Sequence, residues 1–405
     1  MPAPAALIAA WARSAVVPKD GAFGMLGAHE LAAPVVQALL ARAGISPLAV
    51  DAVVVGNALG AGGNPARMVS LAAGLPVQCA ALSVDTQCCS GLDAVSLGAA
   101  LIACGQASVV VAGGVEAWSR APIRLTRPRH PGEEAVAYER PPFAPDPAHD
   151  PDLLLSAARY AAQQGITRVQ QDAYAVLSHQ RAVAHRDTVD HDIVSIAGVQ
   201  HDLYPRALDA ARAARMPIQA HTDSHSASEL ESLSLPDTPA LDCSISRLGI
   251  SAKADGAAFV LLVSASACEK LGLQARARWV SSASTGCAPD TPLLAAQQAA
   301  QHALQQALLA NCDSLHSIEL HDAFAVQGLS FAQALGLNPE RLNPRGGGLA
   351  RGHPIGASGA IALVQLLANM TLDAPMGGLG LVAVAGAGGV GAAAVVEAHS
   401  PANTP

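Results

Sequence analysis

The chain contains few aromatic and few charged side chains. Of its 405 residues, 3% are aromatic and 14% are charged, whereas 51% are hydrophobic and 36 residues are glycine. A nucleic-acid-binding protein would lack its usual stacking side chains, and the net charge of −8 argues against a basic phosphate-binding face. Small aliphatic side chains must fill the core. This composition indicates a globular protein of one or two domains and argues against disorder.

Sequence signals of several other protein classes are also missing. The eight cysteines do not resemble a disulfide scaffold, and no Cys or His cluster has zinc-ligand spacing, so we expect no metal. The apolar segment Met1–Ala12 has no basic region and favours a strand over a signal peptide. Glycines interrupt the apolar stretches Val109–Gly114 and Leu379–Val396, which favours buried strands over membrane spans. We expect a cytoplasmic protein with no membrane or nucleic-acid partner.

Strand and helix patterns alternate in the first and the last third of the chain. The predicted helices of these regions are Glu30–Ala43, which Gly44 ends, Leu92–Ala103 and Leu293–Leu309. The predicted strands are Val50–Val55, Val109–Ala112, Ala258–Val263 and Ser317–Leu320, with a final hairpin of Leu381–Ala385 and Ala392–Val396. Such alternation is typical of a mostly parallel sheet covered on both faces. The second half resembles a weak repeat of the first.

The middle of the chain, from about Ser119 to Asp242, has a different character. Basic and proline-rich stretches surround two clear helical patterns, Leu153–Gln164 and Gln170–Ala184. Insertions of this length in a compact protein are usually functional. We therefore predict a loop or lid domain inserted into a duplicated α/β fold.

Cys88 and Cys89 lie where an apolar run that ends near Val84 meets a helical pattern. A sulfur at such a junction is near the positive end of a helix, where backbone N–H groups favour the thiolate. The thiolate is the nucleophilic form of cysteine, so this position predicts a covalent acyl-enzyme. The alternative is that both cysteines are small residues of the core.

Three further short clusters are candidates for a functional site. His353 stands in the segment Gly352–Gly359, where glycines allow a ligand close to the backbone and the imidazole can donate a proton or hydrogen bond. His321 and Asp322 follow a predicted strand, where open α/β sheets bind ligands, although the pair could equally cap a helix. The third cluster, Ala385–Gly391, lacks the Lys and Ser/Thr of a P-loop.

Together these clusters resemble the motifs of the thiolase superfamily over nearly the whole chain. The matching segments follow the family's order and spacing: Gly56-Asn57, Gly62–Arg67, Cys88–Leu92, Gly113–Glu116, Ser251, Asp255–Ala258, His321–Phe324 and Gly352–Gly359. The segment His321–Phe324 corresponds to the family's Asn-Glu-Ala-Phe motif, and the segment around His353 to its Gly-His-Pro motif. Some of these segments are short, but together, in the family's order and spacing, they are highly specific.

The resemblance implies an α/β, thiolase-like fold of two similar halves with mixed five-stranded sheets and an inserted loop domain. The N-terminal half would span residues 1–118, completed by about 246–270. The loop domain would span 119–245, bind coenzyme A and shape acyl specificity, and the C-terminal half would span 271–405. Proteins of this superfamily generally pair through the nucleophile-bearing half, so a homodimer or homotetramer is implied.

The resemblance also implies a role for each site residue. Cys88 would take an acyl group from a coenzyme A thioester, and His353 would activate its sulfur and stabilise the oxyanion. His321 would position a water or donate directly to the oxyanion. Ser251 would lie beside the pantetheine arm, and Leu153 would stand where biosynthetic thiolases tend to have methionine facing the acyl group. Coenzyme A thioesters would be substrates, with no tightly bound cofactor.

One residue of the family's site is missing. Thiolases carry a second catalytic cysteine, which removes a proton from the second acyl-CoA, in a C-terminal glycine loop. Here Ala385 stands at that position, and no cysteine follows Cys312. Ala387 replaces a glycine whose backbone N–H, retained here, serves the second oxyanion hole. General acid–base groups contribute about 10²–10⁴-fold to rate, so ordinary condensation or thiolysis would need another base, for which His321 is a candidate.

The sequence leaves three functions open. The first is an acyl-CoA-dependent acyltransferase of thiolase type, either an acetyl-CoA C-acyltransferase or one with a non-thioester acceptor. The second is a decarboxylative condensing enzyme, because Cys88, His321 and His353 resemble the Cys-His-His set of ketosynthases and decarboxylation forms a carbanion without a base. The third is a non-catalytic subunit that binds acyl-CoA or an active homologue. The missing cysteine favours this third function, and the intact Cys88 with its partners counts against it.

Overall fold

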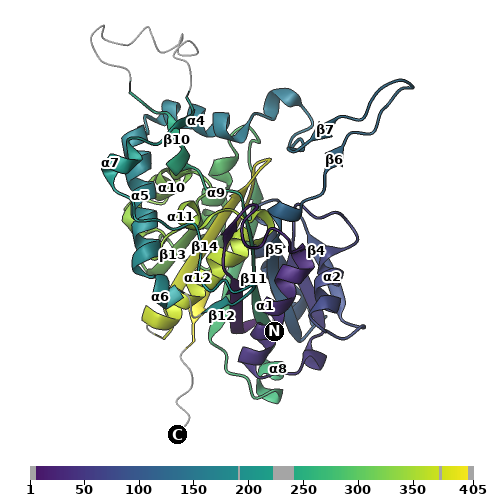
Figure 1. Cartoon of the computed structure of the whole chain (residues 1–405). Coiled ribbons are helices and arrows are strands. Elements are labelled where there is room, and N and C mark those ends of the chain that lie inside the picture. Colours follow the sequence, from purple (N-terminus) through teal and green to yellow (C-terminus); the bar gives the residue numbers. More distant parts are fainter. Residues whose placement is uncertain (1–5, 190–191, 222–240, 374–375, 400–405) are drawn as a thin grey trace.

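The computed structural model describes residues 6–189, 192–221, 241–373 and 376–399 (Figure 1). The N-terminal half contains β1 (Leu7–Ser14), β2 (Val17–Pro18), α1 (Ala28–Ala43), β3 (Ala52–Gly56), α2 (Pro65–Ala72), β4 (Ala80–Val84), α3 (Ser90–Ala103), β5 (Val109–Glu116), β11 (Ala254–Val263) and α8 (Ala265–Lys270). The C-terminal half contains β12 (Ala277–Gly286), α9 (Ala295–Gln306), β13 (Leu315–His321), α10 (Ala325–Ala334), α11 (Gly348–Arg351), α12 (Ser358–Asp373), β14 (Leu379–Gly386) and β15 (Val390–Ala398).

The two halves repeat one topology. The strand order is β4-β3-β5-β11-β1 in the first half and β13-β14-β15-β12 in the second. In both, a parallel edge continues into antiparallel strands: β3 pairs parallel with β5 and β13 with β14, whereas β11 and β15 run antiparallel. A parallel bridge between Ile318 and Leu342 takes the place that β4 has in the first half. The predicted duplication and the mixed sheets are therefore confirmed.

The prediction of a mostly parallel sheet is wrong. A tight turn joins β14 to β15, and such a connection permits only antiparallel pairing. Strand β11, which follows the inserted region, also runs antiparallel to both of its neighbours, β1 and β5. Two residue pairs, Leu7–Arg278 and Ile8–Ala277, join β1 to β12, so the halves share one continuous sheet.

Most predicted elements lie where the sequence places them. Helix α1 ends at Gly44, whose φ of 70° is in the left-handed region that glycine adopts readily. The predicted helix 293–309 is shorter than expected, because Pro292–Leu294 forms a separate 3₁₀ turn before α9. The predicted N-terminal strand is β1 from Leu7 onward, and residues 1–5 lie outside the described residues.

Helices α3 and α12 pack against each other between the two halves. Glycines allow this close packing: a Cβ added to Gly91 of α3 would lie 2.8 Å from the backbone oxygen of Gly356. A Cβ on Gly359 of α12 would lie 2.8 Å from the Cβ of Leu92. The shared hydrophobic core also draws on inward-facing strand residues of both sheet halves. The N-termini of α3 and α12 lie close together, so the residues that precede the two helices are also neighbours.

Burial accounts for the apolar character of α12. The segment Ile355–Leu372 is long and apolar enough to cross a membrane by length and composition, but 83% of it is buried inside the fold. A buried core helix can be as long and as apolar as a helix that spans a membrane. The apolar stretches interpreted as buried strands from the sequence form β5 and the β14–β15 hairpin.

The inserted region packs beside the C-terminal half and sends one arm away from the body (Figure 1). It contains β6 (Arg124–Leu125), β7 (Ala137–Tyr138), α4 (Leu153–Gln164), α5 (Arg168–Ala184), α6 (Arg186–Val189), β8 (Ile193–Val194), α7 (Ala210–Ala213), β9 (Ile218–Ala220) and β10 (Ile245–Ser246). Residues 190–191 and 222–240 of the predicted loop domain lie outside the described residues.

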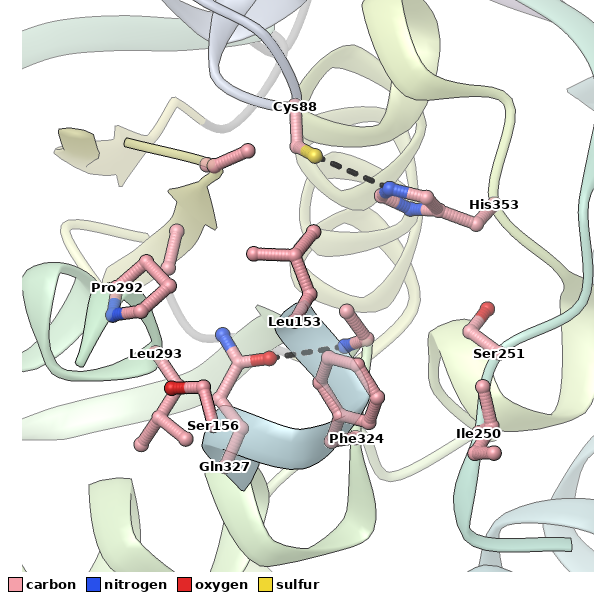
Figure 2. A pocket seen from close by; sticks show the side chains of 14 residues that line it. Cys88, Leu153, Ser156, Ile250, Ser251, Pro292, Leu293, Phe324, Gln327 and His353 are labelled. Carbon is pink, nitrogen blue, oxygen red and sulfur yellow. Dashed lines mark hydrogen bonds between the residues drawn. The ribbon is translucent and has the colours of Figure 1, made fainter. Parts of the chain in front are cut away.

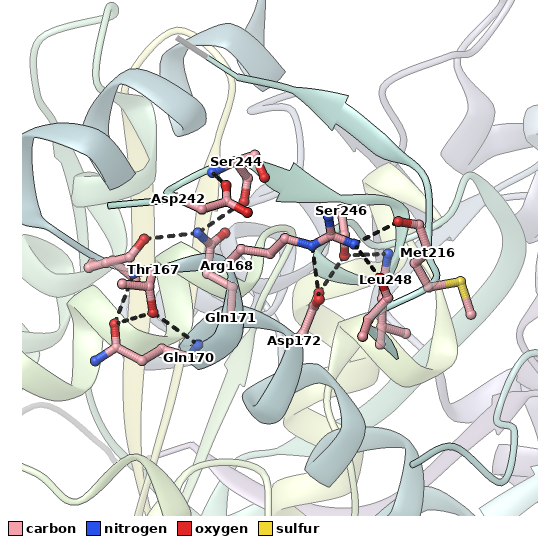
Figure 3. A network of polar contacts seen from close by, with 12 residues as sticks. Thr167, Arg168, Gln170, Gln171, Asp172, Met216, Asp242, Ser244, Ser246 and Leu248 are labelled. Atoms are coloured by element: carbon pink, nitrogen blue, oxygen red, sulfur yellow. Dashed lines mark hydrogen bonds and ion pairs between the residues drawn. The ribbon is translucent and has the colours of Figure 1, made fainter. Parts of the chain in front are cut away.

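A polar network at the start of α5 holds this region together (Figure 3). Thr167 caps the helix through the N–H of Gln170. Arg168 forms an ion pair with Asp172 (3.3 Å) and donates to the backbone oxygen of Met216 (2.7 Å). Asp172 in turn accepts from the Ser246 hydroxyl at 2.5 Å. This network fixes β10, from which the chain runs directly into the site at Ile250 and Ser251.

Candidate active site

Cys88 lies on the tight turn from β4 to α3. Gln87, the residue before it, has φ of 56°, a left-handed conformation that non-glycine residues rarely adopt. The N–H of Cys89 donates to the backbone oxygen of Thr86 (3.1 Å) and closes the turn. Strained turns of this kind persist where the surrounding structure fixes them, often at functional sites. The Cys88 sulfur faces a cavity, whereas the Cys89 sulfur is buried against the backbone oxygen of Val384 (3.5 Å).

His353 lies on the loop that precedes α12, at the other side of the same cavity. Its N–H donates to the Ala252 oxygen (2.6 Å), and its own backbone oxygen accepts from the Trp118 indole (3.0 Å). These bonds fix the backbone, and the imidazole Nε2 then lies 3.0 Å from the Cys88 Sγ (Figure 2). The fold thus brings together two residues that are 265 positions apart in the chain.

Ser358 and His321 both contact the Nδ1 of His353. The Ser358 hydroxyl donates its single hydrogen to the Pro354 oxygen (2.9 Å), so toward the His353 Nδ1, at 3.1 Å, it can only accept. The tautomer with its proton on Nδ1 agrees with this arrangement and leaves Nε2 as an acceptor facing the Cys88 thiol. This is the tautomer that a general base for the sulfur requires.

His321 lies behind His353 and does not line the cavity. It is the last residue of β13, its Nε2 contacts the His353 Nδ1, and the two rings stack with centroids 4.4 Å apart. A side chain on Gly348 would collide with the His321 ring, so this glycine makes room for it. The expectation that His321 donates directly to a substrate oxyanion does not agree with this position. His321 contacts the site only through His353 among the described residues that line the cavity.

Burial sets the protonation states of the reactive pair. It raises the pKa of the Cys88 thiol to about 12, against the smaller opposing effect of backbone N–H groups. It lowers the pKa of His353 to about 4, and it lowers the pKa of His321 well below the usual range, with further lowering by the nearby His353 and Arg351. The sequence predicted that the helix end would favour a thiolate at Cys88. Burial outweighs that effect, and the sulfur stays protonated. The resting pair is a thiol and a neutral imidazole, and the proton moves when sulfur attacks.

Two backbone N–H groups also interact with the Cys88 sulfur. The N–H groups of Ala387 and of Cys88 itself both act to lower the pKa of the thiol, so they face the sulfur. Donors in this position can stabilise the oxygen of an acyl group that is bound to the sulfur. Ala387 therefore keeps the N–H that the replaced glycine provides in thiolases. Ala385, at the position of the missing cysteine, lines the same cavity two residues earlier.

The cavity has a volume of about 120 Å³ and opens beside the Cys88–His353 pair (Figure 2). Of the residues singled out from the sequence, six line it: Cys88, Leu153, Ser251, His353, Ala385 and Ala387. The sequence analysis did not assign a site role to the other lining residues: Ser156, Ile250, Pro292, Leu293, Ala323, Phe324, Gln327 and Gly386. Most of these are apolar, and nothing in the sequence distinguishes Pro292 or Leu293 from ordinary core residues.

Three lining residues contribute polar atoms besides the reactive pair. The hydroxyl of Ser251 donates to the Gly348 oxygen (2.6 Å), and that of Ser156 to the Asp290 oxygen (2.5 Å). The side-chain oxygen of Gln327 accepts from the Ala323 N–H (2.9 Å), which fixes the orientation of the amide. Its Nε2 is buried and has no hydrogen-bond partner among the described residues. A ligand oxygen in the cavity can therefore accept from Gln327.

Glu116 links the two loops that surround the site. Its buried carboxylate accepts from the side chain of Asn57 (2.8 Å), from the N–H groups of Ala58 and Leu59, and from the N–H of Gly356 (2.9 Å). Burial raises its pKa to about 7 against the effect of these donors. Gly356 belongs to the loop that carries His353, so this carboxylate ties His353 to the N-terminal half. Within the described residues, no cluster of His, Cys, Asp and Glu side chains is arranged to hold a metal ion.

Comparisons with known proteins agree with this arrangement. Residues 6–266 match the family model "Thiolase, N-terminal domain", and residues 273–398 match "Thiolase, C-terminal domain". The chain is 34% identical to an acetyl-CoA acetyltransferase of Pseudomonas aeruginosa over 95% of its own length and 97% of that protein. It belongs to the thiolase family and is an acyltransferase of that family.

Solved structures give the same result for the fold. The acetyl-CoA acetyltransferase of Bacillus anthracis superposes with a TM-score of 0.84 at 29% identity, covering 98% of this chain and 99% of that one. A thiolase from Ascaris suum, crystallised with coenzyme A, superposes with a TM-score of 0.83 at 27% identity, covering 97% of this chain and all of that one. The predicted thiolase-like fold is confirmed.

Proposed function

We propose that the chain transfers acyl groups from coenzyme A thioesters through a covalent thioester on Cys88. The observation that carries the proposal is the 3.0 Å contact between the Cys88 sulfur and the Nε2 of His353. His353 takes the thiol proton as the sulfur attacks the acyl carbonyl. The carbon–sulfur bond to coenzyme A then breaks, and His353 returns the proton to the leaving thiolate.

The surrounding residues support this first half-reaction. The N–H groups of Cys88 and Ala387 are placed to stabilise the oxyanion of the tetrahedral intermediate. Leu153 and the other apolar lining residues would hold the acyl group, and Ser251 would lie along the pantetheine arm. The Ascaris suum thiolase binds coenzyme A, which supports the same ligand here. The reaction needs no tightly bound cofactor.

Mass spectrometry of the intact protein tests the proposal. After incubation with acetyl-CoA or butyryl-CoA, the wild-type chain should gain the mass of one acyl group, located by peptide mapping on Cys88. Cys88→Ala should gain none. Cys89→Ala is the matched control, because that sulfur is adjacent in the chain but faces the core, and it should still be acylated. No acylation of the wild type by either donor would reject the proposal.

The two other functions have less support. A non-catalytic subunit has no use for a thiol, a base and oxyanion donors at one cavity. A two-histidine condensing site would need both imidazoles at the substrate, and His321 does not line the cavity. Acylation at Cys88 would eliminate the non-catalytic function.

We also propose that the chain forms a dimer, or a tetramer of such dimers, through the edge of its N-terminal half. Strand β4 is the last strand of the sheet, and one face of it is open to solvent. Large apolar side chains lie exposed on and near it: Leu82, Met68, Leu71 and Val77. An open edge strand of this kind readily pairs with another strand. Analytical ultracentrifugation should find a dimer or larger for the wild type and a monomer for Leu82→Asp, with exposed Leu308→Asp unchanged.

The cysteines support a reducing compartment. All eight are free in the structure, and Cys88 must remain a thiol to react. We therefore propose that the protein works in the cytoplasm, which cell fractionation can test.

A further inference from the structure

The cavity beside Cys88 lacks the second cysteine that removes the α-carbon proton in thiolases, because Ala385 stands at its position. Of the residues that line it, only Cys88 and His353 have titratable side chains. The remaining polar groups are two hydroxyls and an amide, which belong to Ser156, Ser251 and Gln327. None of these three accepts a proton from carbon near neutral pH. Once Cys88 carries an acyl group, His353 is therefore the sole base among the described residues that line the cavity.

We infer that the second substrate of this enzyme is a heteroatom nucleophile, an alcohol, an amine or water, and not the α-carbon of a second thioester. The inference rests on the proposed acyl-Cys88 intermediate and names what removes the acyl group from it. An oxygen or nitrogen atom attacks with a lone pair while its proton is still attached, so one nearby base is sufficient. An α-carbon has no lone pair and must first lose a proton to become nucleophilic.

His353 is well placed for this step. Its Nε2, which accepts from the sulfur in the free enzyme, loses that partner when the thiol is acylated. The nitrogen then faces the region from which a nucleophile approaches the thioester carbon. It takes the proton of the acceptor X–H as X bonds to the acyl carbon. The bond from that carbon to the Cys88 sulfur breaks, and His353 returns the proton to the sulfur. The overall reaction converts acyl-CoA and the acceptor HX–R into acyl–X–R and free coenzyme A.

The geometry disfavours a decarboxylating acceptor as well. A malonyl thioester brings a carboxylate, and within the part of the chain that the structure describes no lysine or arginine lines the cavity to pair with it. The enolate that it forms needs strong donors. The His321 Nε2 contacts the His353 Nδ1, and His321 is not among the residues that line the cavity. A single acceptor nitrogen beside the sulfur is suited to removing a proton from a nucleophile.

The polar atoms at the far side of the cavity fit an acceptor or acyl group that carries oxygen. The buried Gln327 Nε2 offers a donor with no partner among the described residues. The Ser156 oxygen, whose hydrogen is directed to Asp290, offers an acceptor. A neutral hydroxyl or carbonyl group can use these atoms, whereas a carboxylate would lack a counter-charge.

Isotope exchange in D₂O tests the inference without knowledge of the natural acceptor. The full-length wild-type enzyme is incubated with acetyl-CoA and labelled coenzyme A. Label should enter acetyl-CoA, which reports the acyl-Cys88 intermediate, while no deuterium enters the acetyl methyl group. Absence of label exchange would reject the proposed function itself. Label exchange together with deuterium in the methyl group would show a working carbon base and overturn the inference alone.

A second measurement identifies what discharges the intermediate. Acetyl-enzyme freed of coenzyme A is mixed with water alone, glycerol, hydroxylamine, acetyl-CoA or malonyl-CoA. At least one of the oxygen or nitrogen probes should release the acetyl group about 100-fold faster than from heat-denatured acetyl-enzyme, the lower end of general-base contributions. A β-ketoacyl product from acetyl-CoA or malonyl-CoA would overturn the inference. Failure of all three heteroatom probes to exceed the denatured control would overturn it too.

Discussion

The Cys88 sulfur and the His353 Nε2 lie 3.0 Å apart in a site from which burial has removed both charges. Cys88 precedes α3 and His353 precedes α12, the two helices that pack between the halves. The packing of these helices therefore brings the two residues together. A neutral thiol beside a neutral base avoids the cost of a buried ion pair in the resting enzyme. The charges appear only during the reaction, where backbone N–H groups are placed to receive them.

The lowered pKa of His353 predicts an unusual pH dependence of acylation. Burial disfavours the charged imidazolium, so His353 stays neutral, and able to accept the thiol proton, down to about pH 4. An ordinary histidine would become protonated below about pH 6.5. The rate of Cys88 acylation, followed by quenched-flow mass spectrometry, should stay constant from pH 8 to pH 5 and fall around pH 4. Circular dichroism at each pH must show a folded chain, and a fall centred near 6.5 would contradict the assignment.

Removal of the Ser358 hydroxyl should slow acylation without weakening substrate binding. Without this acceptor, the Nδ1–H tautomer of His353 loses one hydrogen bond, worth about 1 kcal/mol, or roughly five-fold in rate. Ser358→Ala should therefore reduce kcat for acylation with little change in KM. Ser96→Ala is the matched control, because Ser96 bonds only to the backbone oxygen of Leu92 in α3. An equal loss in both variants would indicate a helix effect and not a tautomer effect.

Restoring the missing cysteine should restore carbon chemistry. Ala385→Cys places a thiol in the cavity with Cys88 and His353, where it can remove a proton from a second acyl-CoA. The variant should catalyse deuterium entry into the methyl group of acetyl-CoA and gain thiolysis of acetoacetyl-CoA, both absent from the wild type. The double variant Cys88→Ala with Ala385→Cys should not perform thiolysis. An unchanged rate in Ala385→Cys would show that the missing cysteine is not the sole defect.

Glu116→Gln should destabilise the folded chain. Both carboxylate oxygens of Glu116 accept N–H groups, so the amide nitrogen of glutamine would face donors that it cannot satisfy. The cost of leaving such buried groups unpaired is about 1–3 kcal/mol. Urea unfolding should report this loss for Glu116→Gln and almost none for the exposed Glu134→Gln. Slower acylation should accompany the loss, because Glu116 also anchors the loop that carries His353.

Two glycines of α3 should respond differently to the same substitution. A Cβ at Gly91 meets the backbone oxygen of Gly356 at 2.8 Å, whereas a Cβ at Gly98 meets the flexible end of the Leu262 side chain at 2.9 Å. Both substitutions gain about 1 kcal/mol of helix propensity, so the difference isolates the packing term. Gly91→Ala should be less stable than Gly98→Ala in urea and should acylate more slowly, since it pushes α3 away from the His353 loop. Equal stabilities would refute this packing argument.

The sequence by itself determined the local elements and the identity of the reactive groups. Hydrophobic periodicity and glycine stops place α1, α3, α4 and the β14–β15 hairpin within a few residues, because these signals act over one or two turns of chain. The order of short motifs specified a nucleophilic cysteine and two histidines. Ala385 at the place of a second cysteine is also visible in the sequence alone.

Only the tertiary structure decided how these groups work. The protonation states of Cys88 and His353 follow from burial by segments far away in the chain, and local sequence does not encode that desolvation. The positions of His321 behind His353 and of Ser358 beside it depend on the packing of β13 against α12. Antiparallel pairing of β11 and β15 is likewise set by connections between distant segments. The lining of the cavity, with its single base, becomes visible only when both halves and the inserted region come together.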